Sequence, residues 1–106
     1  MSRGLGDVYK RQGEQQMYRQ AQRYIDSSNF DLAIRALQQL ESRYPFGKYA
    51  EQAQLELIYA HHGAFQNEAA IEAADRFIRL HPQHPSVDYA FYMKGVAAYD
   101  LSLIHI

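Results

Sequence analysis

The side chains best suited to chemistry in this 106-residue sequence are its five histidines and a scattering of carboxylates. His61 and His62 are adjacent, and His81 lies three residues before His84. Adjacent histidines on a helix point about 100° apart, so they cannot share one ion. Prolines beside the second pair keep it off a helix face. We therefore expect no metal site.

The acidic residues offer equally little chemistry. Glu51, Glu56 and Glu68 could act as acids or bases, but no histidine or second carboxylate accompanies them in an apolar setting that would separate their pKa values. We interpret them as solvated carboxylates on an outer face. The sequence has no cysteine, and it has no GxSxG, phosphate-loop or HExxH motif. We expect neither an enzyme nor a cofactor.

Length and charge exclude further classes. The chain is in the single-domain size range. Its 11 basic and 12 acidic residues give a net charge of -1, which does not supply the broad basic field that binds nucleic acid. No apolar run approaches the roughly 18 residues of a spanning helix, and the start lacks the layout of a signal peptide. We expect the chain neither to cross a membrane nor to direct its own export.

An internal repeat organises the chain. The segment 30–45 has a near copy at 65–82, in which Ala70 and Pro82 stand where Ala33 and Pro45 stand, 37 residues earlier. This offset is close to the roughly 34-residue period of tetratricopeptide arrays, which close each repeat with a proline. The repeated unit is a pair of helices.

Apolar spacing predicts five helices and no strand. Their expected ranges are Glu14–Ser27, Phe30–Arg43, Lys48–His62, Gln66–Leu80 and Val87–Tyr99, with Ser86 as the N-cap of the last. This pattern predicts an all-α, tetratricopeptide-like solenoid of about two and a half helix-pair repeats. We expect repeat 1 at 13–45, repeat 2 at 46–82 and the first helix of repeat 3 at 83–100.

Three local expectations follow. A left-handed or capping backbone is easily formed in the polar break 27–29, and Gly63 is placed to end the third helix. The 37-residue offset also aligns Ala21, Ile58 and Gly95 at a position where such repeats want a small side chain. Ile58 departs from that rule.

The two ends differ from the middle. Residues 1–12 (MSRGLGDVYKRQ) and 101–106 (LSLIHI) share neither its composition nor its periodicity, and they resemble translated adapter sequence. We expect both to be non-native, which would make the chain an internal fragment of a longer protein.

The first helix of each stacked pair is expected to line a concave surface. Twelve side chains are predicted to face it: Gln15, Tyr18, Gln22, Ile25, Gln52, Leu55, Tyr59, His62, Tyr89, Tyr92, Val96 and Tyr99. Tyrosine combines a rigid apolar face with a polar tip, and glutamine can pair with an extended backbone, so such a wall suits an aromatic peptide. The alternative is that these tyrosines only pack helix against helix.

Three segments carry a family resemblance: SRYPFGKYAEQAQLELIYA at 42–60, DRFIRLHPQHP at 75–85 and DYAFYMKG at 88–95. Over about 14–95 the chain resembles the BamD family, tetratricopeptide lipoproteins of the outer-membrane β-barrel assembly machine. The resemblance implies a five-repeat protein, anchored by a lipidated N-terminal cysteine at the periplasmic side of the Gram-negative outer membrane. It also implies contact with other subunits of that machine and recognition of C-terminal signals on unfolded barrel proteins. The lipidated cysteine and the later repeats are not in this sequence.

Three functions remain open at this point. The first is a non-catalytic scaffold that recognises unfolded barrel proteins through the groove. The second is a general periplasmic adaptor between proteins, such as an envelope or cell-division coordinator. In the third, the solenoid supports a catalytic domain outside this sequence.

Overall fold

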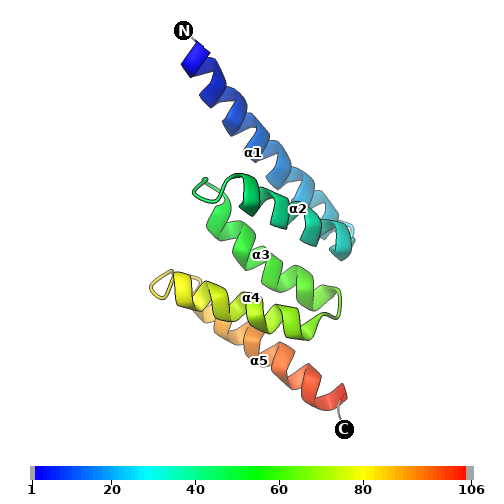
Figure 1. Ribbon diagram of the computed structural model, residues 1–106. Coiled ribbons are helices and arrows are strands. Elements are labelled where there is room, and N and C mark those ends of the chain that lie inside the picture. Colours follow the sequence, from blue (N-terminus) through cyan, green and yellow to red (C-terminus); the bar gives the residue numbers. More distant parts are fainter. Residues whose placement is uncertain (1, 105–106) are drawn as a thin grey trace.

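The computed structural model describes residues 2–104, with side chains from 13 to 103. This part of the chain forms five α-helices: α1 (Ser2–Asp26), α2 (Phe30–Arg43), α3 (Ala50–Gly63), α4 (Asn67–Leu80) and α5 (Val87–Ile104). Each helix packs on the next, and α3 also contacts α5. The result is an elongated stack of 62 × 31 × 17 Å with the two termini at opposite ends (Figure 1). The predicted all-α solenoid is confirmed.

Two hydrophobic clusters hold the stack together, and α3 belongs to both. One side of α3 supplies Ala53, Leu57 and Ala60 to a cluster shared with α1 and α2. Another side supplies Leu55 and Ile58 to a cluster shared with α4 and α5. A helix with neighbours on both sides needs a wide buried face, and seven of the fourteen residues of α3 are buried. Fully buried alanines in all five helices let the helix axes approach closely.

The turn inside each helix pair has the same backbone. Ser28 and Phe65, 37 residues apart, have φ angles of 59° and 61°. In both turns the next amide donates to the carbonyl five residues earlier, from Asn29 to Tyr24 at 2.8 Å and from Gln66 to His61 at 2.9 Å. The left-handed backbone predicted for 27–29 is present, and the period of 37 is a structural repeat.

Gly63 is the last residue of α3, as predicted, but its conformation is not the reason. The residue with positive φ is Phe65, and no glycine in the described part has one. A Cβ at position 63 would lie 2.7 Å from the ring of Phe30. Gly63 therefore lets α3 approach the start of α2.

Three helix boundaries differ from the predicted ones by more than one residue. The first helix begins at Ser2 rather than Glu14, since no proline interrupts 2–13 and a formed helix extends with one hydrogen bond per residue. The third begins at Ala50 rather than Lys48, because two tight turns come first. The Gly47 amide donates to the carbonyl of Tyr44, and the Ala50 amide donates to the carbonyl of Gly47. The fifth continues past Tyr99 to Ile104. That 1–12 and 101–106 are non-native stays a prediction, and residues 1, 105 and 106 lie outside the described part.

The aligned small-residue position behaves differently in each repeat. Ala21 and Ile58 are completely buried, so the second repeat accommodates a large side chain there. A Cβ on Gly95 would meet nothing within 4 Å. No described neighbour of Gly95 therefore requires a small side chain at this position of α5.

Candidate functional site

A groove of about 490 Å³ crosses the odd-numbered helices. Its lining comes from α1, α3 and the start of α5: Tyr18, Gln22, Ile25, Gln52, Leu55, Glu56, Tyr59, Ser86 and Tyr89. Hereafter these nine residues are called the groove. Aromatic rings, amides and one carboxylate face a shared hollow, which is a surface suited to an extended peptide.

Seven of the twelve side chains predicted to face the concave surface come together in the groove: Tyr18, Gln22, Ile25, Gln52, Leu55, Tyr59 and Tyr89. Leu55 is buried, whereas Tyr59 and Tyr89 are partly exposed.

The other five predicted side chains lie elsewhere. Gln15 lines a separate hollow beside Lys48. The ring of His62 is 2.9 Å from the carboxylate of Asp100 on α5. Outside the groove lining on α5 lie Tyr92, Val96 and Tyr99, and the two tyrosines are exposed.

The oblique path of the groove explains this division. It takes residues 18–25 from α1, 52–59 from α3, and Ser86 and Tyr89 from the start of α5 and the residue before it. Because equivalent positions differ by 37, the lining moves about one helical turn towards the N-terminus at each odd-numbered helix. A constant offset along the sequence does not allow for this displacement, which arises from the way the helix pairs stack.

Glu56 was missed as a groove residue. The sequence was interpreted to place it on a solvated outer face, but it is half-buried in the groove. The Tyr18 hydroxyl donates to its Oε2 at 2.5 Å, and Gln22 Nε2 donates to its Oε1. Glu56 follows Gln52 by four residues and precedes Tyr59 by three, so helical spacing could have placed all three on one face.

Burial sets the electrostatics of this contact. It raises the pKa of the Glu56 carboxyl above the ordinary value of a glutamate, while the Tyr18 hydrogen bond acts in the opposite direction. Burial, with the hydrogen bond to Glu56 second, also raises the pKa of the Tyr18 hydroxyl. The phenol therefore remains a donor over the whole neutral range.

Aromatic contacts hold the groove tyrosines in place. The ring of Tyr18 stacks on Tyr49, with centroids 4.5 Å apart. Tyr59 meets the edge of Phe30 at 5.9 Å. Such pairs contribute about 0.5–1.5 kcal/mol beyond burial, and they fix the ring orientations before any ligand arrives.

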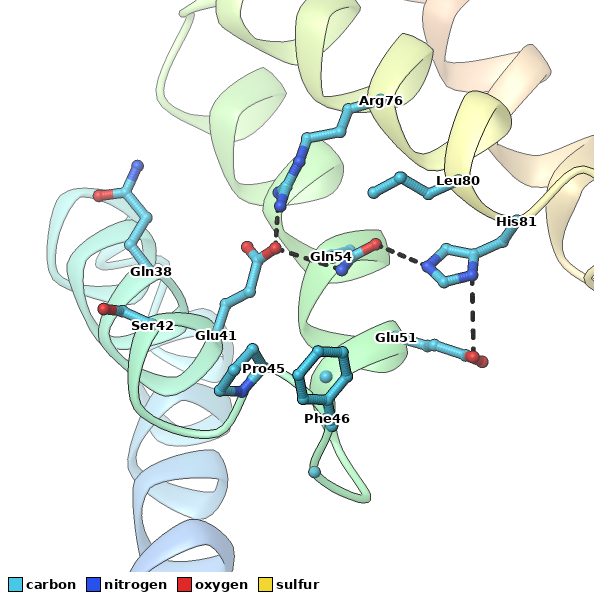
Figure 2. A pocket seen from close by; sticks show the side chains of 12 residues that line it. Gln38, Glu41, Ser42, Pro45, Phe46, Glu51, Gln54, Arg76, Leu80 and His81 are labelled. Atoms are coloured by element: carbon cyan, nitrogen blue, oxygen red, sulfur yellow. Dashed lines mark hydrogen bonds and ion pairs between the residues drawn. The ribbon is translucent and has the colours of Figure 1, made fainter.

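A second, larger hollow of about 760 Å³ lies at the loop end, between α2, α3 and α4 (Figure 2). Four of its polar side chains already bind one another: Glu41, Gln54, Arg76 and His81. Arg76 of α4 pairs with Glu41 of α2 at 2.6 Å, which joins the two repeats. Gln54 donates to Glu41 at 3.2 Å, and its oxygen lies 3.0 Å from His81 Nε2. Few polar groups are left there for a ligand.

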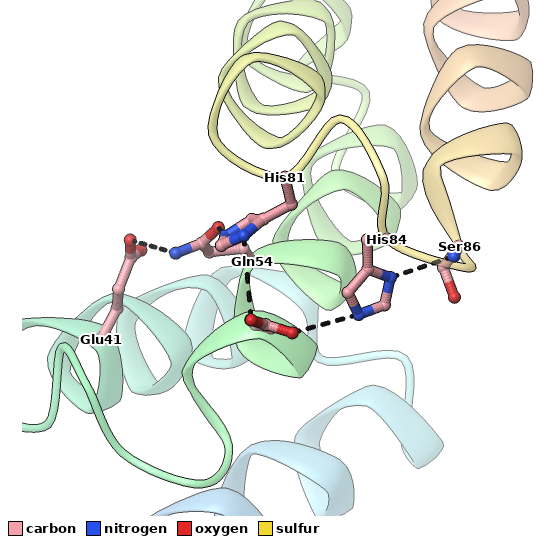
Figure 3. Close-up of polar contacts among 6 residues, drawn as sticks. Glu41, Gln54, His81, His84 and Ser86 are labelled. Atoms are coloured by element: carbon pink, nitrogen blue, oxygen red, sulfur yellow. Dashed lines mark hydrogen bonds and ion pairs between the residues drawn. The ribbon is translucent and has the colours of Figure 1, made fainter.

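The histidines His81 and His84 meet at Glu51, which corrects the expectation that no histidine accompanies that carboxylate. His84 Nε2 is 3.2 Å and His81 Nδ1 3.8 Å from its oxygens (Figure 3). The loop that follows α4 brings them there. Within residues 2–104, no group of three histidine or carboxylate side chains is arranged to hold a metal ion. None of the described helices is long and apolar enough to span a bilayer.

Comparison with known proteins defines the class first. Residues 6–105 match the family model described as tetratricopeptide repeat, so the chain belongs to the tetratricopeptide-repeat family.

Relatives then narrow the family. The chain is 41% identical over 86 residues to the outer membrane protein assembly factor BamD of Neisseria meningitidis serogroup B, covering 81% of this chain and 32% of that protein. It is 40% identical over 92 residues to BamD of Vibrio cholerae, covering 85% and 38%. For BamD of Caulobacter vibrioides the identity is 31% over 93 residues, covering 88% and 30%. The resemblance to the BamD family is confirmed, and the chain spans about a third of these relatives.

Proposed function

We propose that this chain is part of a non-catalytic scaffold in outer-membrane protein assembly, and that its groove binds unfolded β-barrel proteins. The whole protein would act at the periplasmic side of the outer membrane, beside other subunits of the assembly machinery. The relatives named as assembly factors support the setting. The observation that carries the proposal is the groove, in which three tyrosines and two glutamines surround one hollow.

The chemistry of the groove matches its proposed ligand. Barrel strands alternate apolar and polar side chains and end in aromatic girdles, so an unfolded barrel protein presents extended, aromatic-rich segments. Tyr59 and Tyr89 offer partly exposed rings for those aromatic side chains. Gln52 is exposed at the rim, where its amide can pair with backbone groups of an extended chain.

Binding of a short fluorescein-labelled peptide, in which aromatic and threonine residues alternate, tests the proposal by fluorescence anisotropy. Changing Tyr59 and Tyr89 together to Ala should weaken binding about tenfold or more, because truncating an aromatic anchor costs about 1 kcal/mol or more. Both rings are partly exposed, so the fold should persist, which circular dichroism checks.

The matched control is the double change of Tyr92 and Tyr99 to Ala. It removes two exposed tyrosines of α5 that lie outside the groove lining. Affinity should be retained. Equal losses in both double variants, or no loss in the first, would contradict a peptide site in the groove.

A further inference from the structure

The hollow between α2, α3 and α4, called the loop-end hollow below, is bordered by exposed apolar side chains (Figure 2). Phe46, in the loop after α2, is 99% exposed, and Leu80, the last residue of α4, is 50% exposed. Pro45 also lines the hollow. Exposed apolar groups gathered at a concave surface commonly mark a site of protein interaction.

The helix-pair repeat does not require apolar side chains at these two positions. The equivalent residues, 37 positions away, are Gln83 for Phe46 and Arg43 for Leu80. Both are polar and exposed. Packing of the helix pairs therefore does not account for Phe46 and Leu80.

The volume and charge of the loop-end hollow favour one kind of occupant. Its volume of about 760 Å³ is within the usual range of binding sites, about 300–1,000 Å³. Apart from His81, three lining residues carry a charge, and two of them, Arg76 and Glu41, pair with each other. The third is Glu51, whose side chain is 54% exposed although His84 lies 3.2 Å from one of its oxygens. This carboxylate attracts a basic group of a partner and repels an acidic one.

We propose that the loop-end hollow is a docking site for an extended segment of another protein, in which an apolar residue and an arginine or lysine stand two positions apart. Side chains two apart in an extended chain point the same way. The apolar side chain packs against Phe46 and Leu80, and the basic group pairs with Glu51. The loop-end hollow shares no lining residue with the groove, so this inference goes beyond the proposed function and does not depend on it.

Two-dimensional NMR of the purified, ¹⁵N-labelled chain tests this inference. The probe is a short peptide of glycine and serine that contains the sequence Leu-Ser-Arg and is acetylated and amidated at its ends. Its addition should shift the amide signals of Phe46 and Leu80. The signals of Tyr59 and Tyr89, which line the groove, should stay in place. The dependence of the shifts on peptide concentration gives the affinity.

The apolar contact is tested with Phe46→Ala, which should weaken binding about tenfold, as the loss of an aromatic anchor does. Phe65→Ala is the matched control, because Phe65 is 88% exposed and lies outside the hollow lining. It should bind the peptide as the unmodified chain does. Both rings are exposed, so neither change should unfold the chain, which circular dichroism checks.

The charge contact is tested by replacing the arginine of the peptide with glutamine. The unmodified chain should prefer the arginine form about threefold, the effect of an ion pair at a solvent-exposed rim. This preference should disappear in Glu51→Gln, and also at an ionic strength of about 1 M. Glu68→Gln, which changes an exposed carboxylate of α4 outside the hollow lining, should keep it.

The possible outcomes distinguish the occupants. An absence of shifts at Phe46 and Leu80, equal weakening by Phe46→Ala and Phe65→Ala, or an arginine preference that persists in Glu51→Gln would each overturn the proposal. Sedimentation velocity should show a monomer, and a dimer that dissociates in Phe46→Ala would instead assign the hollow to a second copy of the chain.

The two proposals can fail separately. The variant with both Tyr59 and Tyr89 changed to Ala should bind the Leu-Ser-Arg peptide as the unmodified chain does, because these tyrosines lie outside the loop-end hollow. Loss of peptide binding in the groove would therefore leave the docking site standing. Loss of Leu-Ser-Arg binding in this double variant would contradict a separate docking site.

Discussion

The two helix-pair repeats have the same backbone turn, but the loops that follow α2 and α4 are held in place by different side chains. Three pairs of residues stand at equivalent positions, 37 residues apart: Glu14 and Glu51, Gly47 and His84, and Tyr49 and Ser86. In the first repeat the Tyr49 amide donates directly to Glu14 at 3.3 Å, and Glu14 is only 7% exposed. A side chain at Gly47 would overlap that carboxylate.

In the second repeat a histidine ring stands between the carboxylate and the amide. The Ser86 amide donates to His84 Nδ1 at 3.0 Å, so the proton of the neutral ring is on Nε2, which faces Glu51 at 3.2 Å (Figure 3). Glu51 remains exposed as a result. The comparison teaches that one backbone turn can be closed by a buried carboxylate and a glycine or by an exposed carboxylate and a histidine.

The largest effect is expected from Gly47→Ala, which breaks the first arrangement at its tightest point. The new methyl group would displace the Glu14 carboxylate from a packed site, and overpacking typically costs about 1–3 kcal/mol. Urea unfolding followed by circular dichroism measures the loss. Gly95→Ala is the control, because its methyl group meets open space and replaces a helical glycine, so the free energy of unfolding should rise by about 0.5–1 kcal/mol. Equal effects at both glycines would contradict the close contact.

The two equivalent carboxylates should differ in their contribution to stability. Glu14→Ala leaves a partly buried amide unpaired and should lower the free energy of unfolding by about 1–2 kcal/mol. Glu51→Ala should cost about 0–1 kcal/mol, because its contacts are solvent-exposed. Urea midpoints at an unchanged m value compare the two variants. A larger cost for Glu51 would reverse our interpretation of the repeats.

A smaller effect is expected at the shared left-handed turn. Phe65→Gly removes the strain of a side chain at positive φ and loses little burial, since Phe65 is 88% exposed. Stability should rise by about 0.5 kcal/mol, after allowing for the greater freedom of glycine in the unfolded chain. Phe46→Gly is the matched control, because Phe46 is also exposed but has no positive φ. Stabilisation there as well would rule out backbone strain as the cause.

The smallest expected effect is a pH dependence of the free energy of unfolding that arises in the second repeat alone. Position 19, equivalent to Glu56, is an exposed arginine. Burial raises the pKa of Glu56 in the folded chain, so the folded state holds its proton more tightly than the unfolded state. The stability from this group is therefore present below the ordinary glutamate pKa and is lost as the pH rises through the raised value. Urea titrations at a series of pH values across this range measure the free energy of unfolding. Its decline with rising pH should be shallower in Glu56→Gln and unchanged in Glu68→Gln.

Much of the fold could be predicted because each helix pair repeats a local pattern. The bounds of α2, the proline-closed ends of α2 and α4 and the left-handed turn near Ser28 all depend on residues within one or two helical turns. Local turns precede the start of α3, but the hydrogen bond from the Tyr49 amide to Glu14, 35 residues away, could not be predicted from a local pattern. The role of Gly63 also depends on a distant ring, that of Phe30.

The sequence by itself determined the all-helical class, the period of 37 and the fact that tyrosines and glutamines recur on the odd-numbered helices. Only the tertiary structure decided which of them meet. The groove moves about one helical turn along each successive odd-numbered helix, so Tyr89 enters it while Tyr92 and Tyr99 do not. The physical reason is that helix periodicity fixes the face of a side chain, whereas the packing of whole helix pairs fixes where along the axis two faces meet. The same packing brought Glu56 into hydrogen-bonding contact with Tyr18 and Gln22.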